Sequence, residues 1–161
     1  MEAALQGWHP GQVAVQQRLG YADAVKDLWP SIRNNMSEQH RIFHSSNLHF
    51  IPVTTIDENG RPWASIMAGA DGNIGFVKSP NPKTLSITAR LWDGDPLLDT
   101  TAAWLKAKHS DTDISERFLT AGLGIEFSTR RRNKFAGFIE NICPMGESNI
   151  RFHLYVNQAM G

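Results

Sequence analysis

The stretch IPVTTIDENGRPWASIM, residues 51–67, decides the fold of this chain. Apolar and polar side chains alternate over residues 50–56, which is the period-two pattern of a strand. Asp57-Glu58-Asn59-Gly60 then supplies an Asn-Gly pair, the strongest short-range signal for a β-hairpin turn. A return strand is therefore predicted over residues 61–68, and Pro62 is tolerated because it lies at the strand edge.

The alternation recurs later in the chain and predicts further strands. They are expected over residues 74–78, 85–91, 123–129, 134–141 and 150–156. Residues 69–73 are predicted to form a turn, and Ser79-Pro80-Asn81-Pro82 a rigid loop. Because no strand–helix–strand rhythm joins these strands, an antiparallel barrel is favoured over a doubly wound sheet.

Helical patterns precede the strands. A helix is predicted over residues 12–19, and residues 21–35 have helical spacing in which Pro30 begins a new turn. Ser37 is expected to cap a further helix that runs to His44. The chain before the barrel is therefore predicted to be an arm with short helices.

One more helix is predicted over residues 97–108, followed by a polar loop over 109–116. A chain of 161 residues has the length of one domain. Within it we expect the arm and helices at residues 1–48 and the barrel at residues 49–161.

Composition excludes several classes of protein. Sixteen basic residues balance sixteen acidic ones, so no overall charge directs the chain to nucleic acid or to an acidic membrane. The one cysteine, Cys143, excludes a disulfide within the chain and a zinc site built on several thiolates. No apolar run has the length of a signal peptide or a membrane span. We predict a cytoplasmic protein.

Four segments carry a resemblance to a known family. They are Trp8-His9-Pro10-Gly11 and residues 50–69, 79–85 and 124–134. They resemble the FMN-binding split-barrel family of pyridoxamine 5′-phosphate oxidase-like proteins. The subgroup that they resemble lies at the amino terminus of larger oxidoreductases with ferredoxin-reductase-like domains. The resemblance implies a mainly β fold, an antiparallel split β-barrel with N-terminal helices. We also expect the natural protein to extend beyond Gly161, because the last residues look like the start of a further family motif.

The resemblance implies a flavin-dependent oxidoreductase that acts as a homodimer. Two FMN molecules would lie at the subunit interface and transfer hydride or electrons to a small-molecule substrate or an electron-transfer domain. In that family the strand after the hairpin and the next strand and loop hold the phosphate. The matching residues here are Ser65, Ile66, Met67, Lys78, Ser79, Lys83 and Thr84.

Two positions depart from the family pattern. Ser65 stands where the better-known oxidases have an arginine, so the phosphate must find its positive charge elsewhere. Ala136-Gly137 stands where the subgroup more often has Asn-Gly, which puts a side-chain contact at position 136 in doubt.

The basic cluster Arg130-Arg131-Arg132-Asn133-Lys134 is the second site signal. Arginine suits bidentate contact with phosphate or flavin carbonyls, and we predict Arg131, Arg132 and Asn133 near the cofactor or the dimer interface. On a strand, Arg130 and Arg132 would share one face. The alternative is a set of interface salt bridges to Glu126 or Asp57. A nucleic-acid patch is disfavoured because no aromatic platform accompanies the cluster.

Two other functions stay open at this point. The barrel is a non-catalytic dimerisation or ligand-binding module if the altered phosphate site binds nothing. It is a haem or deazaflavin protein if the cofactor differs, and His49 or His153 would then be the axial haem ligand. No residue is predicted as a catalytic acid or base. His40 and His44 lie four apart on a predicted helix, but no third metal ligand is near in sequence.

Overall fold

The computed structural model describes residues 2–108, 118–146 and 148–161. Short helices precede seven strands, and one longer helix interrupts them after the fourth strand. The elements are α1 (Pro10–Arg18), α2 (Ala22–Val25), a 3-10 turn (Trp29–Ser31), α3 (Glu38–Ser46), β1 (Phe50–Ile56), β2 (Pro62–Ala68), β3 (Val77–Asn81), β4 (Thr84–Arg90), α4 (Pro96–Lys108), β5 (Phe118–Glu126), β6 (Arg131–Pro144) and β7 (Asn149–Met160).

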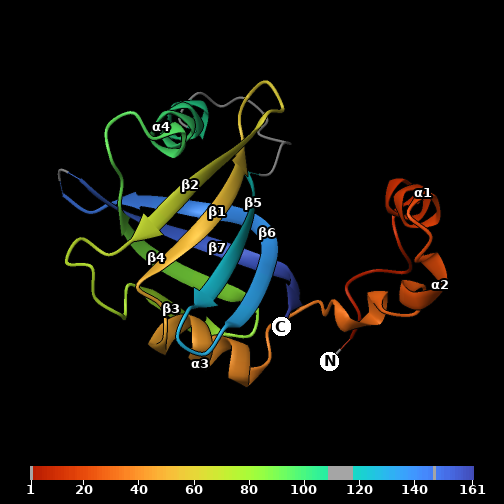
Figure 1. Ribbon diagram of the computed structural model, residues 1–161. Coiled ribbons are helices and arrows are strands. Elements are labelled where there is room, and N and C mark those ends of the chain that lie inside the picture. The colour runs from red at the N-terminus through yellow and green to blue at the C-terminus, as the bar shows by residue number, and fades with distance from the viewer. Residues whose placement is uncertain (1, 109–117, 147) are drawn as a thin grey trace.

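The strands form a seven-stranded antiparallel sheet in the order β2-β1-β5-β6-β7-β4-β3. A further pairing of β2 with β4 closes the sheet into a barrel, with β3 added outside β4 (Figure 1). This closing contact joins only Ala68 and Arg90, so β2 and β4 separate along the rest of their length. The predicted antiparallel split barrel is confirmed.

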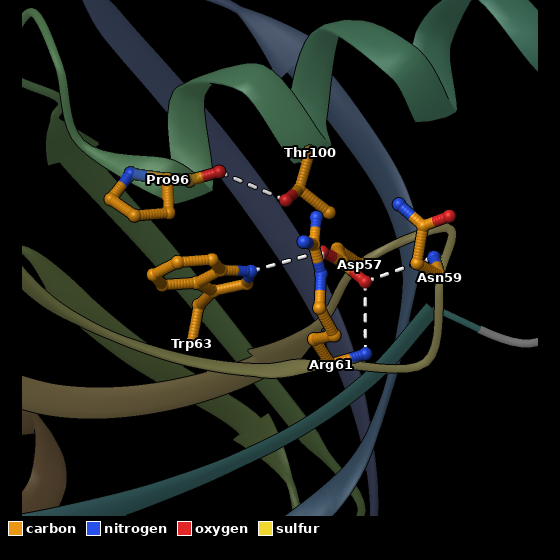
Figure 2. A network of polar contacts seen from close by, with 6 residues as sticks. All are labelled: Asp57, Asn59, Arg61, Trp63, Pro96 and Thr100. Atoms are coloured by element: carbon orange, nitrogen blue, oxygen red, sulfur yellow. Dashed lines mark hydrogen bonds and ion pairs between the residues drawn. The ribbon is translucent and has the colours of Figure 1, made fainter.

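The β1–β2 hairpin forms where the Asn-Gly pair predicts it. Gly60 has a φ of 75°, a left-handed conformation that glycine adopts at low cost. The Asp57 carboxylate accepts the backbone N–H groups of Asn59 and Arg61, each at 2.9 Å. It also accepts the Arg61 Nε at 2.7 Å and the Trp63 Nε1 at 3.0 Å (Figure 2). The bond from Trp63, together with those from Arg61 and Asn59, holds the pKa of Asp57 well below its usual range. The carboxylate therefore keeps its charge and ties the turn to the return strand.

Inward-facing apolar side chains from all the strands fill the barrel, and β3 contributes only its first residue, Val77. The largest fully buried ones include Ile51, Leu85, Ile87, Phe152 and Leu154. Two glycines of β5 make room for rings. Phe135 lies over Gly122, and a Cβ on Gly124 would lie 2.8 Å from the His44 ring. These glycines are required by the packing rather than by the backbone.

The structure corrects the predicted third strand. β3 begins at Val77 rather than at residue 74, and it includes Ser79-Pro80-Asn81, which were predicted as a rigid loop. β3 lies at the edge of the sheet, where the missing N–H of Pro80 is tolerated. The register shifts between Lys78 and Asn81, which marks the irregularity that the prolines introduce.

The later strands differ from prediction in their bounds. β5 begins at Phe118, five residues before the predicted start at 123, because the small residues Ala121 and Gly122 hide its alternation. Arg130 has a φ of 60° and lies in the turn before β6. The predicted shared strand face of Arg130 and Arg132 is therefore wrong, since Arg130 belongs to no strand. The polar loop predicted for 109–116 lies outside the described residues.

The helices form close to where they were expected. The Ser37 hydroxyl accepts the His40 N–H at 3.2 Å and caps α3, as predicted. Pro30 begins a helical turn, here a 3-10 turn. Figure 1 shows α3 beneath one end of the barrel, whereas α1 and α2 stand apart from it. The division of the chain at residue 48 stays a prediction.

Candidate functional site

An open groove of about 420 Å³ lies on the outer face of the barrel. Its lining residues come from strands β1, β2, β5, β6 and β7 and from the segment before α3. Most of the lining residues are apolar, and several of them are small. The lining comprises Ile32, Pro52, Val53, Thr54, Ala64, Ala121, Gly122, Leu123, Lys134, Phe135, Ala136, Gln158, Ala159 and Met160.

Strand register explains why this face is hollow. Ala64 pairs with Thr54, Thr54 pairs with Ala121, and Ala121 pairs with Ala136, so short outward side chains lie in one row across four strands. Beside this row Ile66 is 55% exposed. A solvent-facing side of an antiparallel sheet is usually polar. An apolar outward face of this kind marks a binding surface for a ligand or a partner.

Besides the Thr54 hydroxyl of β1, the polar side chains of the groove lie where β6 and β7 form its end. Lys134 is exposed, pairs with Met160 across the two strands, and is the charged residue in the groove lining. Gln158 adds an amide that both donates and accepts hydrogen bonds. The groove therefore combines a mostly apolar lining with one cation and one amide at its edge.

A second set of outward residues lies on β3, β4 and β7. Lys78 pairs with Ser86, and Thr84 pairs with Tyr155. The Lys83 Nζ lies 3.2 Å from the Tyr155 hydroxyl and 5.6 Å from the centre of its ring. Three of the residues predicted for the phosphate, Lys78, Lys83 and Thr84, thus share one face of the sheet.

An aromatic pair connects this cationic face with the groove. Phe138 and Tyr155 are cross-strand partners whose rings stack with centroids 5.1 Å apart. Phe138 is the next outward residue of β6 after Ala136, which lines the groove. One ligand with an apolar ring system and an anionic tail would therefore find both surfaces on the same side of the sheet.

Ser79 is another residue predicted to bind the phosphate. Its hydroxyl and carbonyl already accept hydrogen bonds from an arginine that the sequence analysis does not identify. Arg41 of α3 donates from Nη2 to the Ser79 carbonyl at 2.7 Å and from Nε to the hydroxyl at 3.3 Å. The Ser79 hydroxyl also lies 3.1 Å from the Thr84 carbonyl, to which it donates. No sequence signal identifies Arg41, because its partner is 38 residues away.

Ser65 lies on the inward face of β2 and is 6% exposed. Its hydroxyl donates to the Asp95 carboxylate at 2.6 Å, and the same oxygen accepts the Leu97 N–H at 2.8 Å. Asp95 is therefore the cap of α4, and Ser65 holds it in place. Because a carboxylate only accepts hydrogen bonds, the Ser65 hydroxyl must donate its single proton to Asp95 and cannot donate it to a phosphate. Met67 also faces inward, whereas Ile66 faces outward next to the groove residue Pro52.

The basic cluster divides between three environments. The Arg131 guanidinium lies 4.8 Å from the centre of the Phe43 ring of α3, a cation–π distance. Arg132 is exposed opposite Ile125, on the outward face that also carries Lys134. Asn133 points inward, is 5% exposed, and its amide nitrogen has no hydrogen-bond partner among the described residues.

The expected acidic partners of this cluster are engaged elsewhere within the chain. Asp57 pairs with Arg61 at 2.7 Å. Glu126 accepts a hydrogen bond from the Asn47 amide at 2.9 Å and another from Thr129. These bonds, the Asn47 bond first, and the nearby Arg131 charge lower the pKa of Glu126. The predicted salt bridges across an interface stay a prediction.

Two histidines of α3 differ in burial: His44 is buried in the core, and His40 is half-buried. His44 is 1% exposed, and neither of its ring nitrogens has a partner in the described part of the chain. Burial, with the charge of His40 as a second cause, lowers the pKa of His44 to about 4. Burial, and then the Arg131 charge, also lowers the pKa of His40. The described residues contain no group of three side chains that would hold a metal ion.

The two histidines considered for haem lie away from the groove. The His49 Nδ1 lies 3.1 Å from the Gly72 carbonyl, and His153 stands opposite Ser86 on β7. Neither belongs to the lining of the groove. Among the helices that the structure describes, none is long and apolar enough to cross a membrane.

No family model and no curated protein matches this chain. Solved structures do. A protein from Lactobacillus delbrueckii, named after pyridoxamine 5′-phosphate oxidase, shares 11% identity over 80% of this chain and 95% of its own, with a TM-score of 0.50. An F420 reductase matches at 10% identity over 73% of this chain and 94% of its own, with a TM-score of 0.46.

A third solved structure is the flavin reductase of styrene monooxygenase from Pseudomonas putida S12. It matches at 6% identity over 76% of this chain and 84% of its own, with a TM-score of 0.44. At such low identity a likeness shows the fold alone. The match to the Lactobacillus protein, together with the strand order and the β2–β4 closure, shows that this chain has the split-barrel fold.

Proposed function

We propose that this chain is an FMN-dependent oxidoreductase module that works as a homodimer. The observation that carries the proposal is the apolar groove of about 420 Å³ on the outer face of a split barrel. The expected partners are a small-molecule substrate or an electron-transfer domain, and the expected location is the cytoplasm.

The residues of the groove fit a flavin ring. An isoalloxazine is a flat aromatic system with polar atoms at one edge, and the groove offers it a mostly apolar lining in which Ala121 and Ala136 leave room. When bound, FMN supplies hydride or electron transfer. The chain itself excludes water from the ring with this lining. Lys134 offers positive charge and Gln158 a hydrogen bond at the edge, which favours a reduced, anionic ring.

The phosphate is assigned to the cationic face beside the groove. Lys83 and Lys78 would each make a charge-assisted contact, worth roughly 1.5 to 3 kcal/mol, and Thr84 would add a hydroxyl. Arg132 lies on the same outward side as Lys134 and is the second candidate cation. Ser65 would contact the phosphate through its backbone only, because its hydroxyl already donates to Asp95.

The exposed apolar face supports the proposed homodimer. Ile66 and Leu119 are 55% and 52% exposed beside the groove, and covering them with a second copy removes apolar surface from water. A cofactor in an open groove would then be enclosed between two barrels.

One observation favours a non-catalytic alternative. The Ser65 hydroxyl at the family's arginine position faces the Asp95 carboxylate, and a carboxylate repels a phosphate. If no cation offsets the repulsion between Asp95 and the phosphate, the barrel is a dimerisation module that retains no flavin.

A visible spectrum and equilibrium dialysis separate these functions. We expect bands of oxidised flavin, or uptake of added FMN by the colourless protein. Ala121→Trp, which fills the groove, should abolish uptake of both FMN and riboflavin, whereas Lys83→Ala should weaken FMN and leave riboflavin unchanged. Glu140→Ala, on an exposed residue outside the groove, is the control. A Soret band would indicate haem, and failure to take up either flavin would overturn the proposal.

A further inference from the structure

The first 35 residues form an arm whose root is fixed to the barrel. Arg33 and Ala159 exchange two backbone hydrogen bonds of 2.8 Å each, which form an isolated antiparallel bridge beside the C-terminal end of β7. Ala4 donates to the Ile32 carbonyl at 2.8 Å, and Asn34 donates to Glu2 at 3.0 Å. The root is therefore part of the sheet and not a loose tail.

The connection between the root and the helices of the arm is also ordered. Ser31 donates its backbone N–H to the Leu28 carbonyl at 3.0 Å and its hydroxyl to the same carbonyl at 2.7 Å. Ile32 donates to the Trp29 carbonyl at 3.1 Å. The Trp8 indole donates to the Val25 carbonyl at 2.8 Å and joins the residues before α1 to the end of α2. These bonds set the direction in which the arm leaves the barrel.

The α1–α2 arm carries four large apolar side chains that stay largely exposed to solvent in the described part of the chain. Figure 1 shows α1 and α2 away from the barrel, joined to it near the C-terminal end of β7. Val15, Leu19, Tyr21 and Leu28 are 53%, 65%, 42% and 53% exposed. Four such residues on one short arm exceed the scattered exposure that is normal for a surface, and they indicate a missing partner.

The root of the arm and the apolar groove are continuous. Ile32 lines the groove, and the Ser31 hydroxyl lies 3.9 Å from the sulfur of Met160, which also lines it. The arm thus leaves the barrel at the edge of the groove and turns away from it. A second barrel placed against the groove would stand between this groove and this arm.

We infer that the α1–α2 arm of each copy lies across the apolar face of the other copy, in an arm-exchanged homodimer. Leu19 and Leu28 cover the partner's exposed Ile66 and the neighbouring end of its groove. The inference rests on the homodimer of the proposed function but not on the flavin, because the surfaces that it joins are present in the protein alone. Two-fold symmetry satisfies both arms and both grooves at once.

Native lysines allow a direct test on the full chain. Lys26 of the arm is 64% exposed at its side chain, and Lys134 is exposed at the groove. The protein is treated with an amine-reactive cross-linker without added FMN, and monomeric and dimeric products are separated under denaturing conditions. We expect the Lys26–Lys134 link in the dimeric product and its absence from the monomeric product. The link in the monomeric product alone, or a protein that stays monomeric, would overturn the inference.

Charge placed on the arm gives a second test. Leu19→Glu together with Leu28→Glu should raise the dimer dissociation constant at least tenfold in sedimentation velocity. Gln17→Glu, which adds one negative charge at an exposed polar position of α1 where the double variant adds two at apolar positions, should leave it unchanged. Because these side chains do not support the barrel, the far-UV circular dichroism spectrum of the folded protein should stay unaltered in all variants. Equal dimerisation of the double variant and the control would refute arm exchange even if FMN binds, and loss of FMN binding with intact exchange would refute only the flavin.

Discussion

Acid should weaken this fold through His44. The imidazole is 1% exposed, lies between the rings of Phe43 and Phe135 at 5.8 and 5.5 Å, and has no hydrogen-bond partner for either nitrogen among the described residues. A proton on this ring would place an unpaired charge in the core. Burial therefore lowers the pKa of His44 from 6.5 to about 4.

The size of the effect follows from that difference. Below pH 6.5 the unfolded chain binds a proton at this residue, whereas the folded chain binds none until the pH nears 4. One pKa unit corresponds to about 1.36 kcal/mol. The free energy of unfolding should thus be undiminished above pH 6.5, fall by about 2 kcal/mol by pH 5 and by about 3 kcal/mol by pH 4. His40, whose pKa is lowered as well, acts in the same direction.

Urea unfolding between pH 7 and 5 measures this loss. His44→Leu and His44→Asn both remove the titrating group, so both should flatten the fall by about 2 kcal/mol. The leucine should also raise stability at pH 7, because it removes two buried nitrogens that lack partners. Between pH 7 and 5 the carboxylates of Asp57, Asp71 and Glu126 stay charged, because their pKa values are lowered, so their protonation does not contribute to the measured loss. An unchanged pH dependence in both variants would show that the buried ring is not the cause.

Three more variants test the packing and the proposed site. Gly124→Ala should lower the free energy of unfolding by about 1–3 kcal/mol, because its Cβ would lie 2.8 Å from the His44 ring, and chemical denaturation measures this. Ser65→Ala should cost about 1–3 kcal/mol by the same assay, since it removes the bond to Asp95, and it should leave flavin retention unaltered; weaker retention would assign the hydroxyl to the phosphate. Lys83→Ala combined with Arg132→Ala should weaken FMN retention well beyond either change alone, and unchanged affinity of the double variant in equilibrium dialysis would discard both as phosphate contacts.

Local patterns in the sequence were sufficient for the parts of the fold that depend on neighbouring residues. The Asn-Gly turn fixed the β1–β2 hairpin, and Ser37 fixed the start of α3, because each acts on backbone groups within a few residues. The strands with clear alternation, such as β1, were found with their bounds. Where small residues replaced large ones, as at Ala121 and Gly122, the alternation vanished and the start of β5 was missed.

Much less of the candidate site than of the fold could be predicted from the sequence. The sequence predicts Lys78, Lys83, Arg131 and Arg132 as cofactor contacts, and this stays a prediction. It does not predict the groove, because the groove arises only when outward alanines of separate strands meet in register. The Ser65–Asp95 and Arg41–Ser79 contacts span 30 and 38 residues and leave no local trace.

By itself, then, the sequence determined the alternation, the turns and the helix caps, which are set by interactions along the chain. The tertiary structure decided which strands are neighbours, and this placed Lys83 beside Tyr155, His44 against Gly124, and the arm at the edge of the groove. The reason is that side chains far apart in the chain can interact only after the barrel has closed.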